Sequence, residues 1–181
     1  MTTTAQQIKW SIDPMHSEVL FKVKHLVIST VTGSFKNFSG SVSFEEDKLE
    51  DASVTFEIDV NSVDTNQEQR DGHLKSADFF DVENYPVISF SSTSFKKVKG
   101  DVYKLEGNLT MKGVTKPVEV EAEFGGTEKD AYGNTKMGFE ITGVINRKEF
   151  GLTYNSITET GGLALGENIK LAANIQLVKE G

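Results

Sequence analysis

The sequence predicts an all-β protein whose antiparallel strands either pack as two sheets or close into a barrel. Apolar and polar residues alternate with a period of two along about eight or nine runs of the chain, and this alternation is typical of antiparallel strands with one face in water. Short turns rich in glycine and polar residues join several of the runs. Only one segment has helical spacing, and a single short helix cannot cover a large open sheet.

The alternation is clearest where Val54, Phe56 and Ile58 are separated by hydroxyl and carboxyl side chains. The predicted strands follow one another in chain order at 8–12, 19–25, 38–44, 54–60, 88–90, 103–111, 118–124, 137–145 and 169–177. The predicted turns carry glycine beside polar residues, at 99–101, 112–113 and 132–134. These observations favour strands joined by short connections in a single unit.

One segment interrupts the alternation and predicts a helix. Thr65 and Glu68 are spaced as in a capping box, with a hydroxyl at the N-cap and a carboxylate three residues later. Arg70 and Leu74 follow at helical spacing, and Pro86 ends any helix that reaches it. We expect one helix of about three turns that can close one end of a barrel.

The composition narrows the possible functions. The chain has 181 residues, which fits one domain spanning 1–181, and it has no cysteine for disulfides or thiolate chemistry. The net charge of −8 disfavours binding to nucleic acid and to anionic membrane surfaces. No apolar run approaches the roughly 20 residues that span a bilayer, so no integral membrane segment is expected. The first residues lack the features of a secretory signal, which predicts a cytoplasmic location.

Small residues occur within the apolar face of the predicted strands. Gly40, Gly107 and Gly143 each stand between two large apolar residues of one face. They either leave a cavity open for a ligand or mark β-bulges and barrel corners. The pattern does not choose between these two interpretations.

A long stretch without clear periodicity covers 146–166. It contains several glycines, but Phe150 and Tyr154 make it too apolar for a free tail. Loops of this length in compact domains are usually functional or disordered. We expect this one to fold across a barrel mouth or into the interior.

Four motifs in order along the chain carry a resemblance to a known family. They are HSEVLFKVKH (16–25) with GSF (33–35), VDT (63–65) with RDGHLKSADFFD (70–81) and YPVISF (85–90), GNLTMKGVTKPV (107–118), and NRKEFG (146–151). Together they resemble the YceI-like family of polyisoprenoid-binding proteins. The resemblance implies a single antiparallel eight-stranded lipocalin-like barrel with one short α-helix capping one end. It also implies a long hydrophobic tunnel that takes an isoprenoid tail, no established catalytic residue, and many periplasmic relatives.

The expected ligand is a long-chain polyisoprenoid or a similar amphipathic lipid, such as a prenyl quinone, a prenyl phosphate or a fatty acid derivative, held for storage, shielding or transport. At about −0.3 kcal/mol per heavy atom, an enclosed tail of about 40 carbons would bind with about −12 kcal/mol, or nanomolar affinity. No other cofactor is expected. No metal is expected either, because His16, His25 and His73 lack the spacing of metal ligands.

The expected ligand-binding side chains are mostly apolar or aromatic, with one imidazole and one guanidinium. They are Trp10, Phe21, His25, Leu74, Phe79, Phe80, Phe90, Leu105, Phe139, Ile141, Arg147, Phe150 and Leu171. His25 can hydrogen-bond a carbonyl or phosphate head, but a core histidine bonded to backbone is the simpler interpretation. Arg147 suits a phosphate or carboxylate head, but an ion pair with one of the many acids is simpler.

Two other functions compete with lipid binding. An enzyme acting on the bound isoprenoid predicts a polar cluster inside the cavity, and a scaffold for protein interaction predicts a filled interior and an exposed apolar patch. A catalytic triad of Asp13, His16 and Ser17 is disfavoured because the three residues are too close in sequence. A homodimer through an exposed terminal strand is a further expectation.

Overall fold

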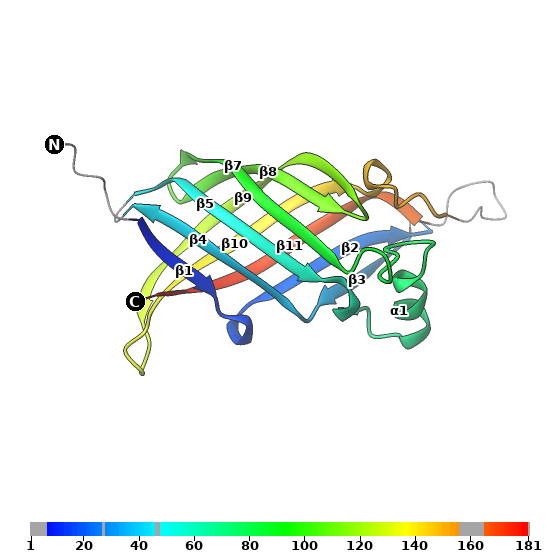
Figure 1. Cartoon of the computed structure of the whole chain (residues 1–181), viewed down its shortest axis with the longest axis horizontal. Helices are drawn as coiled ribbons and strands as arrows, with labels where there is room; N and C mark the ends of the chain where they lie inside the picture. Colours follow the sequence, from blue (N-terminus) through cyan, green and yellow to red (C-terminus); the bar gives the residue numbers. More distant parts are fainter. Residues whose placement is uncertain (1–6, 27, 46–47, 156–164, 181) are drawn as a thin grey trace.

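Eleven strands form one antiparallel sheet in the computed structural model, which describes residues 7–26, 28–45, 48–155 and 165–180. The sheet closes into a ring of eight strands in the order β1-β4-β5-β7-β8-β9-β10-β11, with β11 pairing back to β1 (Figure 1). The predicted fold, an eight-stranded antiparallel barrel with one short helix, is confirmed. The elements are β1 (Gln7–Ile12), η1 (Pro14–His16), β2 (Glu18–His25), β3 (Ser29–Phe35), β4 (Phe38–Glu45), β5 (Lys48–Asp59), η2 (Val60–Ser62), β6 (Val63–Asp64), α1 (Glu68–Lys75), β7 (Val87–Lys99), β8 (Val102–Met111), β9 (Val114–Lys129), β10 (Thr135–Asn146), η3 (Arg147–Phe150) and β11 (Leu165–Lys179).

Eleven strands make an eight-stranded ring because some long barrel strands are interrupted. β1 and β2 both pair with β11, through Ile12 with Leu177 and through Val19 with Ala173. The 3₁₀ turn η1 separates them, since Pro14 lacks the N–H that a ladder needs. β3 and β4 continue one another in the same way, with β3 beside β2 and β4 beside β1.

The sequence pattern missed β3. Its inward positions are Val31, Gly33 and Phe35, so the apolar alternation is broken in the middle. Gly33 lies directly opposite Phe21 on β2, and a Cβ on Gly33 would lie 2.2 Å from Phe21 Cζ. The Phe21 ring therefore supplies the apolar surface that β3 lacks at this point.

The helix is shorter than predicted, and it is not capped by Thr65. α1 has eight residues, its N-cap is Gln67, and no side chain caps it. Thr65 is instead buried, where its Oγ1 donates to Asp71 Oδ1 at 2.5 Å and accepts from Arg70 Nε at 2.7 Å. No helix among the described residues is long and apolar enough to cross a membrane.

The two ends of the barrel differ. One end, called here the terminal end, carries the start of β1 and the end of β11, and the other, the helix end, carries α1 (Figure 1). A buried apolar cluster fills each end. The middle part of the long aperiodic stretch, 156–164, lies outside the described residues. Because β1 pairs with β11 inside the ring, the terminal strand that was expected to pair with a second copy already has a partner.

A small ion cluster fixes η1 to the barrel wall. Lys136 Nζ on β10 lies 2.6 Å from Asp13 Oδ2 and 3.1 Å from Gln176 Oε1, and His16 Nδ1 lies 2.7 Å from the same Asp13 oxygen. The hydrogen bond from Lys136, followed by that with His16, lowers the pKa of Asp13 to about 2. The two side chains of the Lys136–Asp13 pair are only 14% and 15% exposed.

Replacing Asp13 with asparagine should remove part of the pH dependence of stability. The folded pKa is below the ordinary value, so the ionised carboxylate stabilises the fold above about pH 4, and this is lost as the pH falls towards 2. Allowing for screening by solvent, we expect the wild type to exceed Asp13→Asn by about 1 kcal/mol at pH 5 and to match it at pH 2. Thermal unfolding of both proteins across this range checks it. An equal difference at both pH values would show that the Asp13 charge plays no part.

Candidate functional site

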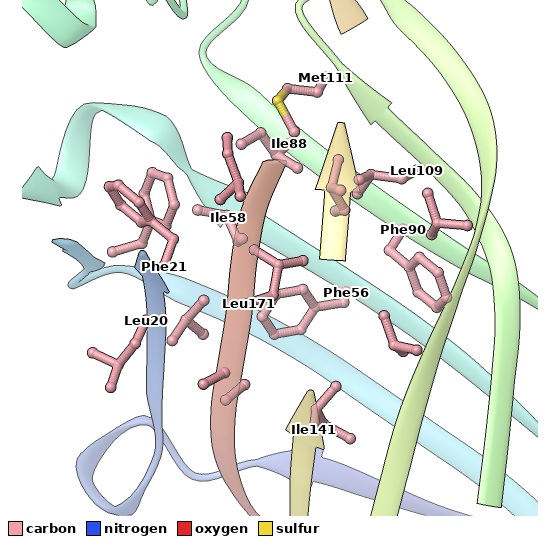
Figure 2. Close-up of a pocket in the computed structure, with 18 of the residues that line it drawn as sticks. Leu20, Phe21, Phe56, Ile58, Ile88, Phe90, Leu109, Met111, Ile141 and Leu171 are labelled. Atoms are coloured by element: carbon pink, nitrogen blue, oxygen red, sulfur yellow. The ribbon is translucent and has the colours of Figure 1, made fainter. Parts of the chain in front are cut away.

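A cavity of about 810 Å³ lies inside the barrel. Ile12 and Leu177 line it near the terminal end, and Thr65 and His73 line it at the helix end, so the cavity runs along the barrel. Its middle is walled by hydrocarbon from several strands. Figure 2 shows side chains from around this wall, with Leu20, Phe21, Phe56, Ile58, Ile88, Phe90, Leu109, Met111, Ile141 and Leu171 labelled.

The burial pattern along the wall also indicates a hollow interior. Phe56, Phe90 and Ile141 lie mid-barrel and line the cavity, yet each keeps part of its surface accessible. By contrast, Leu177 at the terminal end and Leu152 at the helix end are almost fully buried. A close-packed core would bury the middle at least as well as the ends, so the packing is loosest at the waist of the barrel.

The bulge interpretation holds for Gly107, which lies opposite the register shift at Ser92–Ser94, whereas the ladders are regular at Gly40 and Gly143. A Cβ on Gly107 would lie 2.4 Å from Phe90 Cζ, and one on Gly40 would lie 2.7 Å from the backbone oxygen of Thr55. Neither glycine has a positive φ. The space above Gly107 is therefore occupied by an aromatic ring, and the absence of a side chain there lets Phe90 lie close against the wall.

Packed side chains seal the terminal end. Trp10 and Phe44 stack at 5.9 Å, and Phe95 and Tyr103 stack at 4.9 Å. Trp10 was expected to contact the ligand, but it does not line the cavity. It is 5% exposed and belongs to the cluster beyond the closed end. The large indole packs there because the barrel is filled by side chains at that level.

The helix end carries most of the polar groups that line the cavity. Gln67, Gln69 and His73 line it and are also exposed to solvent, which indicates that the cavity opens beside α1. His73, Phe79 and Tyr154 form a rim in which each pair of ring centres lies 4.9–5.0 Å apart. An apolar ligand tail would pass this aromatic rim to enter.

Arg147 is buried at this end, and only 3% of its surface is exposed. Its Nε donates to the backbone oxygen of Gly166 at 2.8 Å, and its Nη1 donates to the backbone oxygens of Leu152 and Tyr154 at 2.6 and 2.8 Å. Burial lowers the pKa of the guanidinium, an effect that the charge of Glu167 opposes. Among the described residues it forms no ion pair with a carboxylate, the partner that the simpler interpretation of Arg147 expects.

The NRKEFG motif shapes the turn that holds Arg147. Asn146 Oδ1 accepts a hydrogen bond from the N–H of Lys148 at 3.0 Å, which starts η3, and Gly151 ends it with a φ of 77°. Phe150, expected in the ligand site, is fully buried and does not line the cavity. Its ring packs in the cluster at the helix end and anchors this turn, which explains its position outside the wall.

His25 does not have the backbone partner expected of a core histidine. Its side chain is half-buried and lines the cavity. In the part of the chain that the structure describes, its ring makes no hydrogen bond, and the one side chain that binds the residue, Ser29 Oγ, donates to its backbone oxygen.

All but two of the expected ligand-binding side chains line the cavity. Those that line it are Phe21, His25, Leu74, Phe79, Phe80, Phe90, Leu105, Phe139, Ile141, Arg147 and Leu171. Phe56 and Tyr154, which are not among the expected residues, also line it. The alternation of 54–60 already placed Phe56 on the apolar face, whereas Tyr154 lies in an aperiodic stretch that carries no such signal.

The described histidines and carboxylates do not gather into a metal site, and Asp13, His16 and Ser17 do not form a catalytic triad. Over the described ranges, no group of three His, Asp or Glu side chains is arranged to hold a metal ion. Asp13 and His16 are in contact, but Ser17 Oγ accepts from the Gln176 N–H at 2.9 Å and so bonds to the β11 backbone.

Comparison with known proteins places the chain among close relatives. Residues 10–177 match a family model described as a YceI-like domain. A UPF0312 protein of Pectobacterium atrosepticum is 42% identical over 149 residues, which are 82% of this chain and 77% of that protein. Protein YceI of Salmonella newport is 41% identical over 152 residues, which are 84% of this chain and 79% of that protein.

Solved structures share the barrel. The Campylobacter jejuni YceI protein is 34% identical and superposes with a TM-score of 0.76, covering 87% of this chain and 90% of that one. BcnA of Burkholderia cenocepacia, 24% identical with a TM-score of 0.79 over 91% of this chain and 98% of that one, shares the fold. So does a domain from Saccharophagus degradans that is described as polyisoprenoid-binding, at 15% identity and a TM-score of 0.70, covering 94% of this chain and 98% of that one.

Proposed function

The chain belongs to the YceI-like family, and from this premise we propose that its barrel binds a long-chain apolar lipid, such as a polyisoprenoid, for storage, shielding or transport. The observation that carries the proposal is the cavity of about 810 Å³ with a hydrocarbon wall, sealed at the terminal end. The Saccharophagus degradans domain with the same fold is described as polyisoprenoid-binding, which supports this choice of lipid class. The lipid itself would be the only bound cofactor.

Binding is preferred over catalysis because of what lines the middle of the cavity. Between the two ends the wall presents side chains such as Phe56, Phe90 and Leu171, which offer no group for acid–base or nucleophilic chemistry. Burial of a hydrocarbon tail against such a wall is favourable by about 0.8 kcal/mol per methylene. The wall therefore suits a ligand that is held rather than converted.

The cavity volume limits the length of the tail. At about 30 Å³ per heavy atom, which is the share of a water molecule in liquid, 810 Å³ holds about 27 heavy atoms. A tail of about 40 carbons, as considered from the sequence, would be enclosed only in part. With about −0.3 kcal/mol per heavy atom, the enclosed part gives about −8 kcal/mol, or micromolar affinity.

A series of prenols of increasing length tests the proposed function. Each five-carbon unit should add about 1.5 kcal/mol, so affinity should rise roughly tenfold per unit up to about 25 carbons and then level off. Displacement of a fluorescent fatty acid by C10, C15, C20, C25, C30 and C40 prenols measures this. Affinity that does not depend on length, or no displacement by any prenol, would contradict binding in the barrel.

A further inference from the structure

Arg147 carries a hydrogen-bond donor that the protein leaves unused. Its Nη2 is buried and has no hydrogen-bond partner among the described residues, although Nε and Nη1 together bind three backbone oxygens. The residue lines the cavity. Buried polar atoms nearly always have a partner, so this orphan nitrogen requires an explanation.

Arg147 also has no carboxylate in contact with it among the described residues. Backbone oxygens are dipoles and do not neutralise a guanidinium, and a buried cation is costly without a counter-charge. The charge of Glu167 on β11 acts on the guanidinium, but its carboxylate is paired with Lys148 at 2.9 Å. Within the described residues, the site therefore lacks an acceptor for Nη2 and a carboxylate in contact with the guanidinium.

Two other side chains of the cavity wall that can carry a positive charge, Arg70 and His73, are already engaged. Arg70 uses Nε and Nη2 on Thr65, at 2.7 and 2.6 Å, and His73 Nε2 lies 3.0 Å from Asp78 Oδ2. Arg147 is thus the arginine of the cavity wall that keeps a buried donor without a partner.

His25 lies beside the same stretch of wall as Arg147. It pairs with Leu165 across β2 and β11, and Arg147 binds the backbone oxygen of the next residue, Gly166. His25 also lines the cavity, and its ring has no hydrogen bond within the described ranges. Two side chains that can donate hydrogen bonds therefore flank one segment at the helix end.

We propose that an anionic oxygen of the lipid head group, from a carboxylate or a phosphate, binds Arg147 Nη2 beside His25, with the tail directed toward Trp10 and Phe44. This inference rests on the proposed function and adds the class and the orientation of the ligand. A charged oxygen supplies the missing acceptor and a negative charge in contact with the guanidinium, and hydrogen bonds between two charged groups are the stronger kind. The terminal end is sealed by aromatic side chains, and its orphan donor, Trp10 Nε1, belongs to a residue that does not line the cavity, so this end suits the tail.

Three probes with one C20 prenyl tail test the head-group site: geranylgeraniol, geranylgeranoic acid and geranylgeranyl phosphate. The wild type should bind at least one of the two anions about 10–100-fold more tightly than the alcohol, as expected for a hydrogen bond with a charged partner, and the preferred anion identifies the source of the oxygen. Isothermal titration at pH 8 with each probe gives the ratio of affinities. Equal affinity for all three would overturn the inference and leave the proposed function intact, whereas binding of none would overturn both.

Variants locate the effect. In Arg147→Gln the ratio of anion to alcohol affinity should fall close to one, while in Lys148→Gln, which removes an exposed charge from the same turn, it should match the wild type. His25→Gln should reduce the ratio by less than Arg147→Gln does. If Arg147→Gln does not fold, the ratio of anion to alcohol affinity in the wild type and in His25→Gln still tests whether a head group binds at this site. A ratio that falls as much in Lys148→Gln would overturn a specific role for Arg147.

Discussion

Replacing Ala173 with tryptophan is expected to weaken prenol binding about 100-fold. Ala173 lines the cavity on β11, directly opposite Ile141 on β10, so an indole at this position projects into the middle of the lumen. It adds about nine heavy atoms and displaces a similar number of ligand atoms, which at about 0.3 kcal/mol each amounts to about 3 kcal/mol. Because the indole enters empty space, stability should be unchanged or slightly higher.

The control for this variant is Thr142→Trp. Thr142 lies on β10 next to Ile141, but it is exposed and faces away from the lumen. The Thr142→Trp protein should bind C20 prenol as tightly as the wild type does in the same displacement assay. If the Ala173→Trp protein is folded and binds prenol as tightly as Thr142→Trp does, the ligand does not occupy the waist of the barrel.

Replacing Gly33 with alanine is expected to lower both the stability and the affinity for prenol. The new Cβ would lie 2.2 Å from Phe21 Cζ, with two further atoms of the same ring within 2.8 Å. The ring must then leave the wall, lose its present contact with Phe35 at 5.3 Å, and turn into the cavity. Overpacking of this kind costs about 2 kcal/mol, which corresponds to a fall in Tm of about 4–8 °C in a chain of this size.

Thermal unfolding of Gly33→Ala, Phe21→Leu and the double variant measures the coupling free energy between positions 33 and 21. The double variant should be more stable than the sum of the two single changes predicts, because the smaller leucine relieves the clash. Gly138→Ala is the matched control, since Gly138 also lies in a strand but has nothing within 4 Å of the position of a Cβ. A Gly33→Ala protein as stable as Gly138→Ala would show that the ring does not need the wall position.

The barrel could be predicted from the sequence because each of its strands exposes one face to solvent. Polar residues outside and apolar residues inside produce an alternation that needs no tertiary knowledge. The pattern failed at β3, where the space above Gly33 is occupied by the ring of Phe21 from the neighbouring strand. It also misassigned Thr65, whose hydroxyl serves Asp71 and Arg70 rather than a helix N-terminus. For β3 the partner lies on a neighbouring strand, and for Thr65 it lies in the helix that follows; periodicity reports neither contact.

The wall of the cavity was largely predictable, whereas its limits were not. Alternation shows which side chains face inward. It does not show that Trp10 and Phe150 lie in clusters near the two ends of the barrel, where other side chains fill the interior. Whether side chains fill the barrel at a given height along its axis depends on the residues that all of its strands contribute there. Likewise, the partners of Arg147 are backbone oxygens of a folded turn, and residue type alone favoured a carboxylate.

The open interior also bears on the competing scaffold function. A barrel that only supports a protein-binding surface gains stability from a filled core, whereas this one leaves about 810 Å³ of space inside its hydrocarbon wall. Leaving such a cavity empty in water is unfavourable for its apolar lining. The cavity is therefore best explained by a ligand that fills it.

Organic extraction of the natively folded protein, followed by mass spectrometry of the extract, tests most directly whether the barrel carries a lipid. The wild type should release a long-chain lipid near one molecule per chain, and Ala173→Trp prepared in parallel should release much less. A wild type that releases no lipid above the Ala173→Trp background, and that takes up no prenyl lipid when refolded with it, would contradict a ligand-filled barrel.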